Sequence, residues 1–242
     1  MGYIQGFLVP VPQDNKEAYR AMAAGAVPFF KKHGMVRMVE CWGVDVPHGE
    51  TTDMYRGVKA EDGENVVFSW VDWGSQETAD KAHQAMMDDP DMEMPGEMPF
   101  DGMRMAFAGF ELLGEKGPGG KSGYVQGYLA PAPVENRAAV EKMTAAMRDI
   151  AIDAGALRAL DGWGADIADG KVTDLKQAVK ARDGEAVLFG FHEWPDQAAY
   201  ESGSARMRED ERMAGFGTDM PVDGKRMVFG GFDVLLDTDQ EG

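Results

Sequence analysis

The sequence is poor in the residues that build disulfides, metal sites and anion-binding surfaces. It has one cysteine, Cys41, and four histidines in 242 residues. A single cysteine forms no internal disulfide and excludes a cysteine-rich zinc site, so we predict no metal and no other cofactor. The 24 basic residues are outnumbered by 42 acidic ones, which gives a formal net charge of −18. This charge repels phosphate backbones and anionic lipids, so we expect neither nucleic acid nor a membrane as a partner.

Long apolar runs are also missing. No stretch approaches the ~20 apolar residues that a membrane-spanning helix needs. The opening residues, MGYIQGFLVPVPQDN, lack a basic segment followed by a cleavage site. We therefore expect a cytoplasmic location. Apolar residues make up 44% of the chain and charged residues 27%, which is typical of a globular protein with a buried core.

One long motif occurs twice in the chain. GYIQGFLVPVPQDN at Gly2 matches GYVQGYLAPAPVEN at Gly123, and Trp163 follows Trp42 at the same spacing, 163 − 42 = 121 residues. A repeat of this length is a whole domain and not a solenoid unit, so we predict a tandem duplication. The predicted organisation is a first domain, a linker rich in Gly, Pro and Ser, and a second domain, at 1–115, 116–122 and 123–242.

Each repeat shows the periodicities of strand, helix, strands, helix and strand. In the first repeat, β-branched and aromatic runs predict strands, and apolar residues at helical spacing predict helices. The predicted strands lie at 3–9, 35–46, 66–73 and 103–113, with a further extended segment at 54–60 and helices at 15–33 and 75–88. Gly34, and Gly155 in the second repeat, are positioned to end the first helix of each repeat.

The first strand carries bulky side chains on both faces. Tyr3 and Phe7 point one way while Ile4 and Leu8 point the other, because side chains alternate along a strand. The two helices of one repeat cover only one face of its sheet, so the other face must be covered by the second repeat. We predict an α+β fold in which the two repeats pack sheet to sheet as an intrachain pseudo-dimer, either monomeric or forming a weak homodimer of chains.

Three long motifs resemble the DUF1428 family, which consists of bacterial proteins of unknown function, usually about half this length. They are YIQGFLVPVP from Tyr3, VECWGVDVP from Val39 and MPFDGMRM from Met98. The resemblance implies two ferredoxin-like domains of the dimeric α+β barrel superfamily, whose sheets pack together. That superfamily includes cofactor-independent monooxygenases, isomerases and ligand-binding modules, so the fold does not determine a function. The resemblance supplies no catalytic residue.

Polar and aromatic residues at matching positions of both repeats are the candidates for ligand binding. They are Gln5 and Gln126, Trp42 and Trp163, Asp45 and Asp166, Lys59 and Lys180, and Arg104 and Arg226. An arginine beside apolar residues either pairs with a carboxylate or binds an anionic ligand through its planar fork. A tryptophan either packs in the core or lines a small-molecule cleft. Both interpretations stand for each residue type, since structural needs also preserve residues.

His192 is the catalytic candidate. It replaces Val71 of the first repeat and is followed by Glu193. A neutral imidazole at this place could act as an acid or a base if it faced the cavity between the domains. A packed or solvent-facing histidine is the alternative. Cys41, which has no neighbouring base in the sequence, is interpreted as a buried, unreactive thiol.

Three functional hypotheses follow. The first is a protein that binds a small organic molecule, anionic or aromatic, in a cleft between sheet and helices or between the two sheets. The second is a cofactor-independent oxygenase or isomerase that uses His192 or an acidic residue as its base. The third is a structural or protein-interaction module, which is favoured if aromatic and Met side chains fill the cavities and if Arg104 and Arg226 pair with carboxylates.

Overall fold

The computed structural model describes residues 2–88, 98–216 and 220–240. The first repeat contributes strands β1 (Tyr3–Pro12), β2 (Arg37–Asp45), β3 (Glu64–Asp72) and β4 (Ala106–Lys116), with helices α1 (Lys16–Lys32), α2 (Met54–Gly57) and α3 (Gln76–Asp88). The second contributes β5 (Tyr124–Pro133), β6 (Arg158–Gly164), β7 (Glu185–Trp194) and β8 (Val228–Asp237), with α4 (Arg137–Asp153), α5 (Leu175–Ala178) and α6 (Gln197–Glu209).

The eight strands form one closed antiparallel barrel in the order β1-β3-β2-β8-β5-β7-β6-β4. Within each repeat the first strand lies between the third and the fourth. The repeats join along two seams, where β2 pairs with β8 and β4 pairs with β6. The prediction of a mixed α and β fold is confirmed. The sheets face each other across the barrel interior, and their edges are hydrogen-bonded to each other, which leaves every strand with two neighbours.

Aromatic rings from both repeats fill the barrel interior. Phe68 stacks on Phe189 with ring centres 4.8 Å apart, and Trp70 stacks on Phe191 with ring centres 3.8 Å apart. These four side chains are fully buried in one cluster. The space between the two sheets, which was one of the clefts expected from the sequence, is therefore a packed core.

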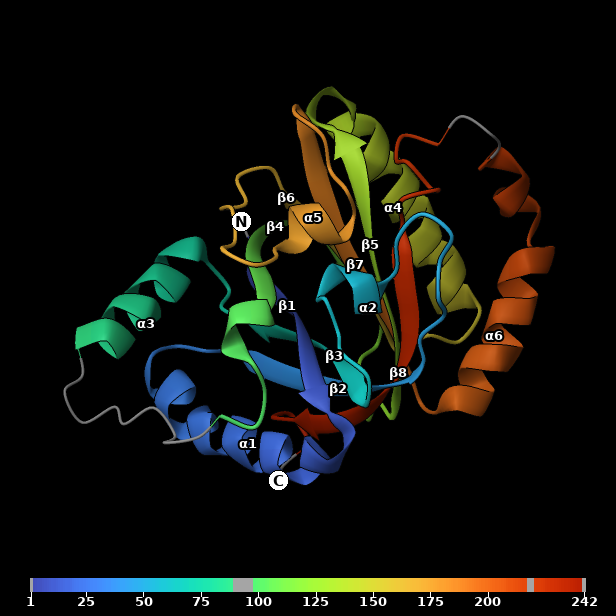
Figure 1. Cartoon of the computed structure of the whole chain (residues 1–242). Helices are drawn as coiled ribbons and strands as arrows, with labels where there is room; N and C mark the ends of the chain where they lie inside the picture. The colour runs from blue at the N-terminus through green and yellow to red at the C-terminus, as the bar shows by residue number, and fades with distance from the viewer. Residues whose placement is uncertain (1, 89–97, 217–219, 241–242) are drawn as a thin grey trace.

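One end of the barrel is capped by α2 and α5, which lie against each other (Figure 1). The loops before these helices cross between the repeats: the Thr52 hydroxyl donates to the carbonyl of Ala178 at 2.8 Å, and the Thr173 hydroxyl donates to the carbonyl of Gly57 at 2.6 Å. The prediction that 54–60 is extended is wrong. Asp53 accepts a hydrogen bond from the backbone N–H of Arg56 at 2.8 Å, and this cap begins a short helix.

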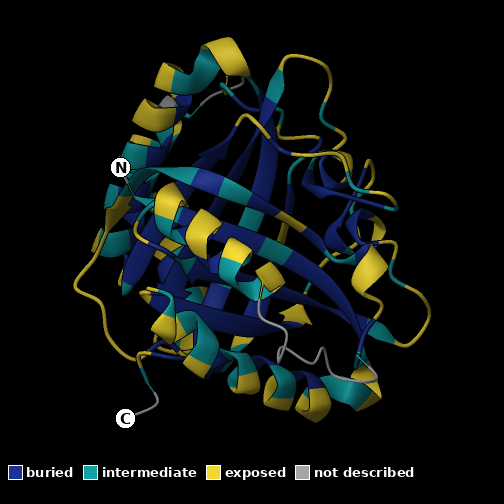
Figure 2. Cartoon of the chain, turned by 90° about the vertical axis from the view of Figure 1, so that its left-hand side faces the viewer, coloured by how far each residue is buried: buried dark blue, intermediate teal, exposed yellow. Residues whose placement is uncertain are grey.

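The four longer helices cover the outside of the barrel. α1 packs against β1, β2 and β8, and α4 packs against β4, β5 and β6, so each of these helices covers a seam between the repeats (Figure 1). α6 packs against β7, and α3 packs through Ala79 and Ala82 beside Trp73. In Figure 2 the strands are largely buried while the outward faces of the helices are exposed. Each sheet thus has one surface toward the barrel interior and one toward its helices. Among the helices of the described ranges, none combines the length and the hydropathy that crossing a bilayer requires.

Two boundaries differ from their predicted positions. The last strand of the first repeat begins at Ala106, because Gly102–Arg104 forms a 3-10 turn that the Asp101 side chain caps through the N–H of Met103. The same strand continues to Lys116, inside the predicted linker, where it pairs with β6. Gly34 and Gly155 end α1 and α4 with φ values of 94° and 104°, a conformation that glycine adopts without strain.

Candidate functional site

Arg104 and Arg226 are held in equivalent ion pairs. The terminal nitrogens of Arg104 donate to the Glu64 carboxylate at 2.6 and 2.7 Å. Those of Arg226 donate to Glu185, both at 2.7 Å, and hydrogen bonds from Arg226 hold the pKa of Glu185 below its ordinary value. Each Nε also donates to a nearby aspartate, Asp101 in the first repeat. This geometry favours the structural interpretation of both arginines.

The two candidate lysines fasten the cap. Lys59 and Lys180 occupy the left-handed region, with φ values of 52° and 50°. Each side chain reaches into the other repeat: Lys180 donates from Nζ to the carbonyl of Thr51 at 2.6 Å, and Lys59 donates to the carbonyl of Val172. These bonds join the two crossing loops, so both lysines connect the repeats to each other.

The tryptophans and glutamines lie on the surfaces that face the helices. Trp42 and Trp163 are buried in separate apolar clusters, one in each repeat. Gln5 accepts a hydrogen bond from the indole N–H of Trp73 at 2.7 Å. Gln126, at the matching position of the second repeat, is half-buried. The hydrogen bond between Gln5 and Trp73 is therefore a feature of the first repeat.

The last candidate pair, Asp45 and Asp166, is exposed at the ends of β2 and β6. The candidate pairs thus occupy the cap, two separate helix-facing surfaces and the exterior of the barrel. The structure does not bring them together in one site. The residues that recur in both repeats are thus ones that stabilise the barrel, because both repeats have the same structural needs.

A different residue, Glu40, has the properties of a functional group. It lies in the middle of β2 on the surface that faces α1, and only 7% of it is exposed. The phenol O–H of Tyr19, on α1, donates to its Oε2 at 2.8 Å. Ser69 lies opposite in register on β3. Within the described ranges, no lysine, arginine or histidine forms a salt bridge with Glu40.

Burial without a cation makes Glu40 a weak acid. The charged carboxylate loses its hydration in this environment, so burial raises the pKa of Glu40 to about 7, while the hydroxyls of Tyr19 and Ser69 act in the opposite direction. Burial also raises the pKa of Tyr19 well above its ordinary value, so its phenol stays a hydrogen-bond donor. Near neutral pH both protonation states of Glu40 are populated, as proton transfer requires.

The surroundings of Glu40 are apolar and partly adaptable. Tyr19 packs with other buried residues in one cluster, and partly exposed side chains pack against it. The buried members are Val9, Val11, Trp42, Val67 and Phe100, and the partly exposed ones include Phe7, Met22, Met98 and Met105. The Lys16 ammonium lies 5.3 Å from the centre of the Trp42 ring. Aromatic walls suit an organic ligand, and methionines adjust their shape around one.

In the second repeat, the equivalent carboxylate is paired with a cation. Asp161 occupies the position of Glu40, 161 − 40 = 121 residues later, and is fully buried. It accepts hydrogen bonds from the Tyr128 phenol and from Nη1 of Arg148, each at 2.5 Å. Burial raises the pKa of Asp161 while Tyr128 and Arg148 lower it. Asp161 is therefore paired with a cation that Glu40 lacks.

Two glycines make this pairing possible. A Cβ atom at Gly190 would lie 2.5 Å from the Tyr128 ring, and one at Gly114 would lie 2.5 Å from the Arg148 guanidinium. Beside Glu40, the positions that match Gly190 and Gly114 hold Ser69 of β3 and Leu236 of β8. The difference between the two carboxylates is thus determined by the small residues of the neighbouring strands.

His192 faces the helices of the second repeat. The condition for its catalytic role, that it faces the cavity between the repeats, is not met, because strand alternation turns Phe191 and Glu193 into the barrel and His192 outward. Its ring lies edge-on to Tyr128, with centres 5.8 Å apart. Burial, with a smaller effect of Arg148, lowers the pKa of His192 to about 4. The imidazole is therefore neutral at pH 7, and neither ring nitrogen has a partner within the described residues.

Comparison with known proteins places the chain in a family. The family model for a protein of unknown function, DUF1428, matches residues 2–102 and 123–224. The chain belongs to the DUF1428 family. Its curated relatives include the uncharacterized protein YbaA of Escherichia coli strain K12, which is 56% identical over 114 residues, 47% of this chain and 97% of YbaA. YbaA of Shigella flexneri matches to the same extent.

Solved structures with little sequence identity share the fold of this DUF1428 protein. An anthrone oxidase-like protein superposes with a TM-score of 0.51 over 98% of this chain and 92% of its own. A protein from Fusobacterium nucleatum subsp. nucleatum, provisionally named a monooxygenase, gives a TM-score of 0.54 over 98% and 93%. Each is 10% identical to this chain, so the similarity extends to the fold alone.

Proposed function

We propose that this DUF1428 protein binds a small, largely apolar organic molecule beside Glu40 and exchanges a proton with it. The observation that supports this most is the buried carboxyl without a cation, hydrogen-bonded to Tyr19, with a pKa of about 7. A buried charge without a partner destabilises a protein, and such groups are concentrated at catalytic sites. The function is thus small-molecule binding coupled to acid–base chemistry.

The proposed step is a proton transfer. The Glu40 carboxylate removes a proton from a C–H or O–H group of the substrate, and the electron pair of that bond stays on the substrate. In an isomerisation, the carboxylic acid returns the same proton to another atom of the same molecule, so atoms and charge balance without a cofactor. The Tyr19 O–H stabilises Glu40 in its deprotonated, carboxylate form. Oxygenation would start with the same removal and would need O2 as the oxidant.

The first repeat is proposed to carry the reaction, and the second to complete the barrel. Asp161 already accepts hydrogen bonds on both oxygens, from Tyr128 on Oδ1 and from Arg148 on Oδ2, so neither oxygen is free to take a substrate proton. This division of roles fits two ferredoxin-like halves that arose by duplication and then specialised. The competing function, a structural module without a ligand, is supported by the aromatic barrel interior and by the paired Arg104 and Arg226.

Deuterium exchange tests the proposal without knowledge of the final product. Dithranol and 2-indanone serve as carbon acids in D2O, and proton NMR measures the loss of the acidic C–H signal. The wild-type protein is expected to accelerate the exchange, and Glu40→Gln to slow it by about 100-fold or more. His192→Gln serves as the buried control in the second repeat and should exchange as fast as the wild type. Equal rates for Glu40→Gln and the wild type, or no acceleration of either acid, would overturn the proposal.

A further inference from the structure

The end of the barrel opposite the α2 and α5 cap holds a network of six charged side chains, which we call the mouth network. Its members are Arg37, Asp72 and Glu115 of the first repeat and Arg158, Glu193 and Asp237 of the second. They occupy matching positions, since 158 − 37 = 121, 193 − 72 = 121 and 237 − 115 = 122. Each arginine therefore meets carboxylates of the opposite repeat.

Arg37 is fully engaged in this network. Its two terminal nitrogens donate to the Glu193 carboxylate, both at 2.9 Å. Its Nε and Nη2 donate to Asp237 at 3.0 and 2.8 Å. Both partners are buried, with 1% and 4% of the residue exposed. Arg37 thus makes two bidentate pairs, one with Asp237 across the seam between β2 and β8 and one with Glu193 of β7. Oδ2 of the exposed Asp239 lies a further 3.4 Å from its Nε.

Arg158, at the matching position, is only partly engaged. Its Nε donates to Glu115 at 2.6 Å, but its terminal nitrogens lie 3.7 Å from Asp72 and 3.6 Å from Glu193. These separations are too long for hydrogen bonds. Asp72 is one methylene shorter than Glu193 at the matching position, so it does not reach the guanidinium. Within the described residues the terminal fork of Arg158 therefore has no hydrogen-bond acceptor, although the residue is only 9% exposed.

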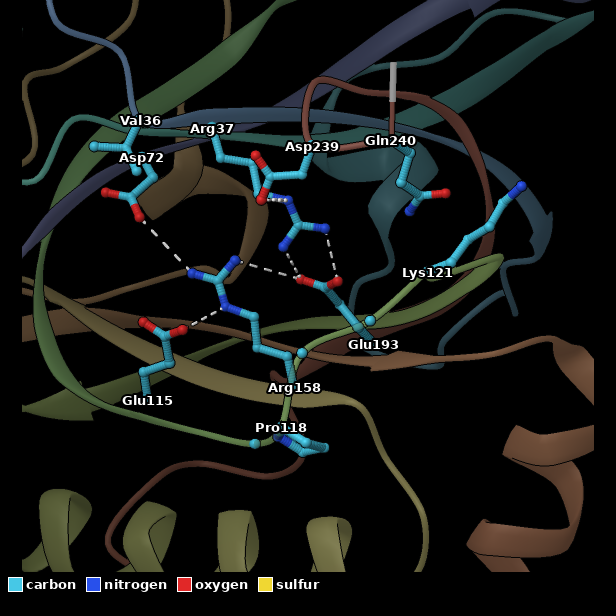
Figure 3. Close-up of a pocket in the computed structure, with 13 residues that line it drawn as sticks. Val36, Arg37, Asp72, Glu115, Pro118, Lys121, Arg158, Glu193, Asp239 and Gln240 are labelled. Atoms are coloured by element: carbon cyan, nitrogen blue, oxygen red, sulfur yellow. Dashed lines mark hydrogen bonds and ion pairs between the residues drawn. The ribbon is translucent and has the colours of Figure 1, made fainter. Parts of the chain in front are cut away.

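The terminal nitrogens of Arg158, which lack an acceptor among the described residues, lie in a cavity. Figure 3 shows the Arg158 guanidinium between Asp72, Glu115 and Glu193, with the linker residues alongside. The cavity has a volume of about 660 Å³ and is also lined by 117–121 of the linker and by Asp239 and Gln240 near the C-terminus. Cavities of ~300–1,000 Å³ are typical of small-molecule sites. The mouth of a barrel, between two halves of a chain, is a common place for one.

The charges of the lining restrict the ligand. Arg37, Arg158 and Lys121 provide three cationic groups, and Asp72, Glu115, Glu193 and Asp239 provide four carboxylates. A simple anion would be repelled by the carboxylates, which outnumber the cationic groups. A simple cation would leave the Arg158 fork without a hydrogen-bond acceptor. A molecule with a carboxylate and an ammonium group satisfies both sides. Burial raises the pKa of Asp72 and of Glu193, which indicates that their charges are incompletely compensated.

We propose that the cavity at the mouth network binds a small zwitterion of the amino-acid type, with its carboxylate on the Arg158 fork and its ammonium group beside Glu115 and Asp239. The site is separate from Glu40, because the mouth network lies inside the barrel and Glu40 faces α1 on the outside. Failure of the proton-transfer proposal would therefore leave this site unaffected. Binding at the mouth would also connect the linker, the C-terminal segment and both repeats.

Isothermal titration calorimetry with the full chain tests the site. The probes are the twenty protein amino acids, with putrescine as a cation without a carboxylate and succinate as an anion without an amine. We expect at least one amino acid to bind and both comparison compounds to bind at least about tenfold more weakly. Absence of heat with all twenty, or equal binding of putrescine or succinate, would overturn the proposal.

Asp72→Glu is the decisive variant. It adds the missing methylene, so the carboxylate can occupy the Arg158 fork as Glu193 occupies that of Arg37. We expect amino-acid binding to weaken at least about tenfold while the Tm is maintained. Asp45→Glu, the same change at an exposed position, should bind as the wild type does. Arg158→Lys keeps the charge, removes the planar fork and should also lose binding. Wild-type affinity in a folded Asp72→Glu or Arg158→Lys protein would refute the assignment.

Discussion

Replacement of Glu40 by glutamine should change how stability depends on pH. In the folded protein the pKa of Glu40 is about 7, against an ordinary value of 4.5. The folded state therefore holds this proton more tightly than the unfolded state does. The resulting stabilisation is fully present below pH 4.5, decreases as the pH rises from 4.5 to 7, and is lost above pH 7. Glutamine does not titrate, so the variant lacks this contribution to the pH dependence.

The size of the effect follows from the two pKa values. They differ by about 2.5, and a tenfold change in proton affinity corresponds to about 1.4 kcal/mol, so the wild type should lose about 3 kcal/mol between pH 4.5 and pH 8. The carboxyl is 7% exposed, so solvent screens this contribution little. The free energy of unfolding of Glu40→Gln, relative to that of the wild type, should therefore rise by about 3 kcal/mol over the same range.

Urea unfolding followed by tryptophan fluorescence measures this difference at a series of pH values. Other titrating groups are common to both proteins and cancel when the two curves are subtracted. Glu17→Gln, which removes an exposed carboxyl on the first turn of α1, is the matched control. Parallel wild-type and Glu40→Gln curves from pH 4.5 to 8 would refute the assignment of a weakly acidic Glu40, and with it the basis for proton transfer.

Three further outcomes test the architecture. Arg104→Ala leaves the buried Glu64 carboxylate without its partner and should lower the free energy of unfolding by about 3 kcal/mol; a loss below about 1 kcal/mol in urea titrations would contradict the structural interpretation. Phe189→Ala removes a central ring of the barrel and should lower the free energy of unfolding by about 4 kcal/mol in the same assay. A small loss would indicate a loosely packed interior. The stabilising contribution of His192 is present above pH 6.5 and is lost as the pH falls toward 4, so the wild type should lose stability relative to His192→Val on acidification. The imidazole NMR signal that disappears in His192→Val would contradict this if it titrated near pH 6.5.

Much of the fold could be predicted because it depends on local patterns that occur twice. The β1 pattern of alternating apolar side chains, exemplified by Ile4 and Phe7, required cover on both sides of the sheet, and the barrel provides it. Gly34 and Gly155 predicted the ends of the first helix in each repeat. The segment 54–60 was assigned incorrectly, because its apolar residues suggest a strand while the cap by Asp53 makes a helix that closes the barrel.

The candidate site was harder to predict, although its residues are visible in the sequence. Glu40 is an acidic residue between Val39 and Cys41 in an apolar strand, a pattern that signals a buried carboxyl. Its low acidity depends on what surrounds it, namely burial and the absence of a salt-bridging cation in the described residues, which outweigh the opposite effect of the Tyr19 hydroxyl. Asp161, at the same place in the repeat, differs because Arg148 reaches it from α4 and forms an ion pair with it.

The sequence by itself determined the repeat and the alternation of side chains along the strands. These properties depend on neighbouring residues of the chain, so their pattern can be read directly. Only the tertiary structure decided which charges meet. Arg37 and Arg158 begin strands, and charged residues at strand ends usually extend into water. Closure of the barrel brings the ends of six strands together, and the difference of one methylene between Asp72 and Glu193 then leaves one arginine paired and the other open.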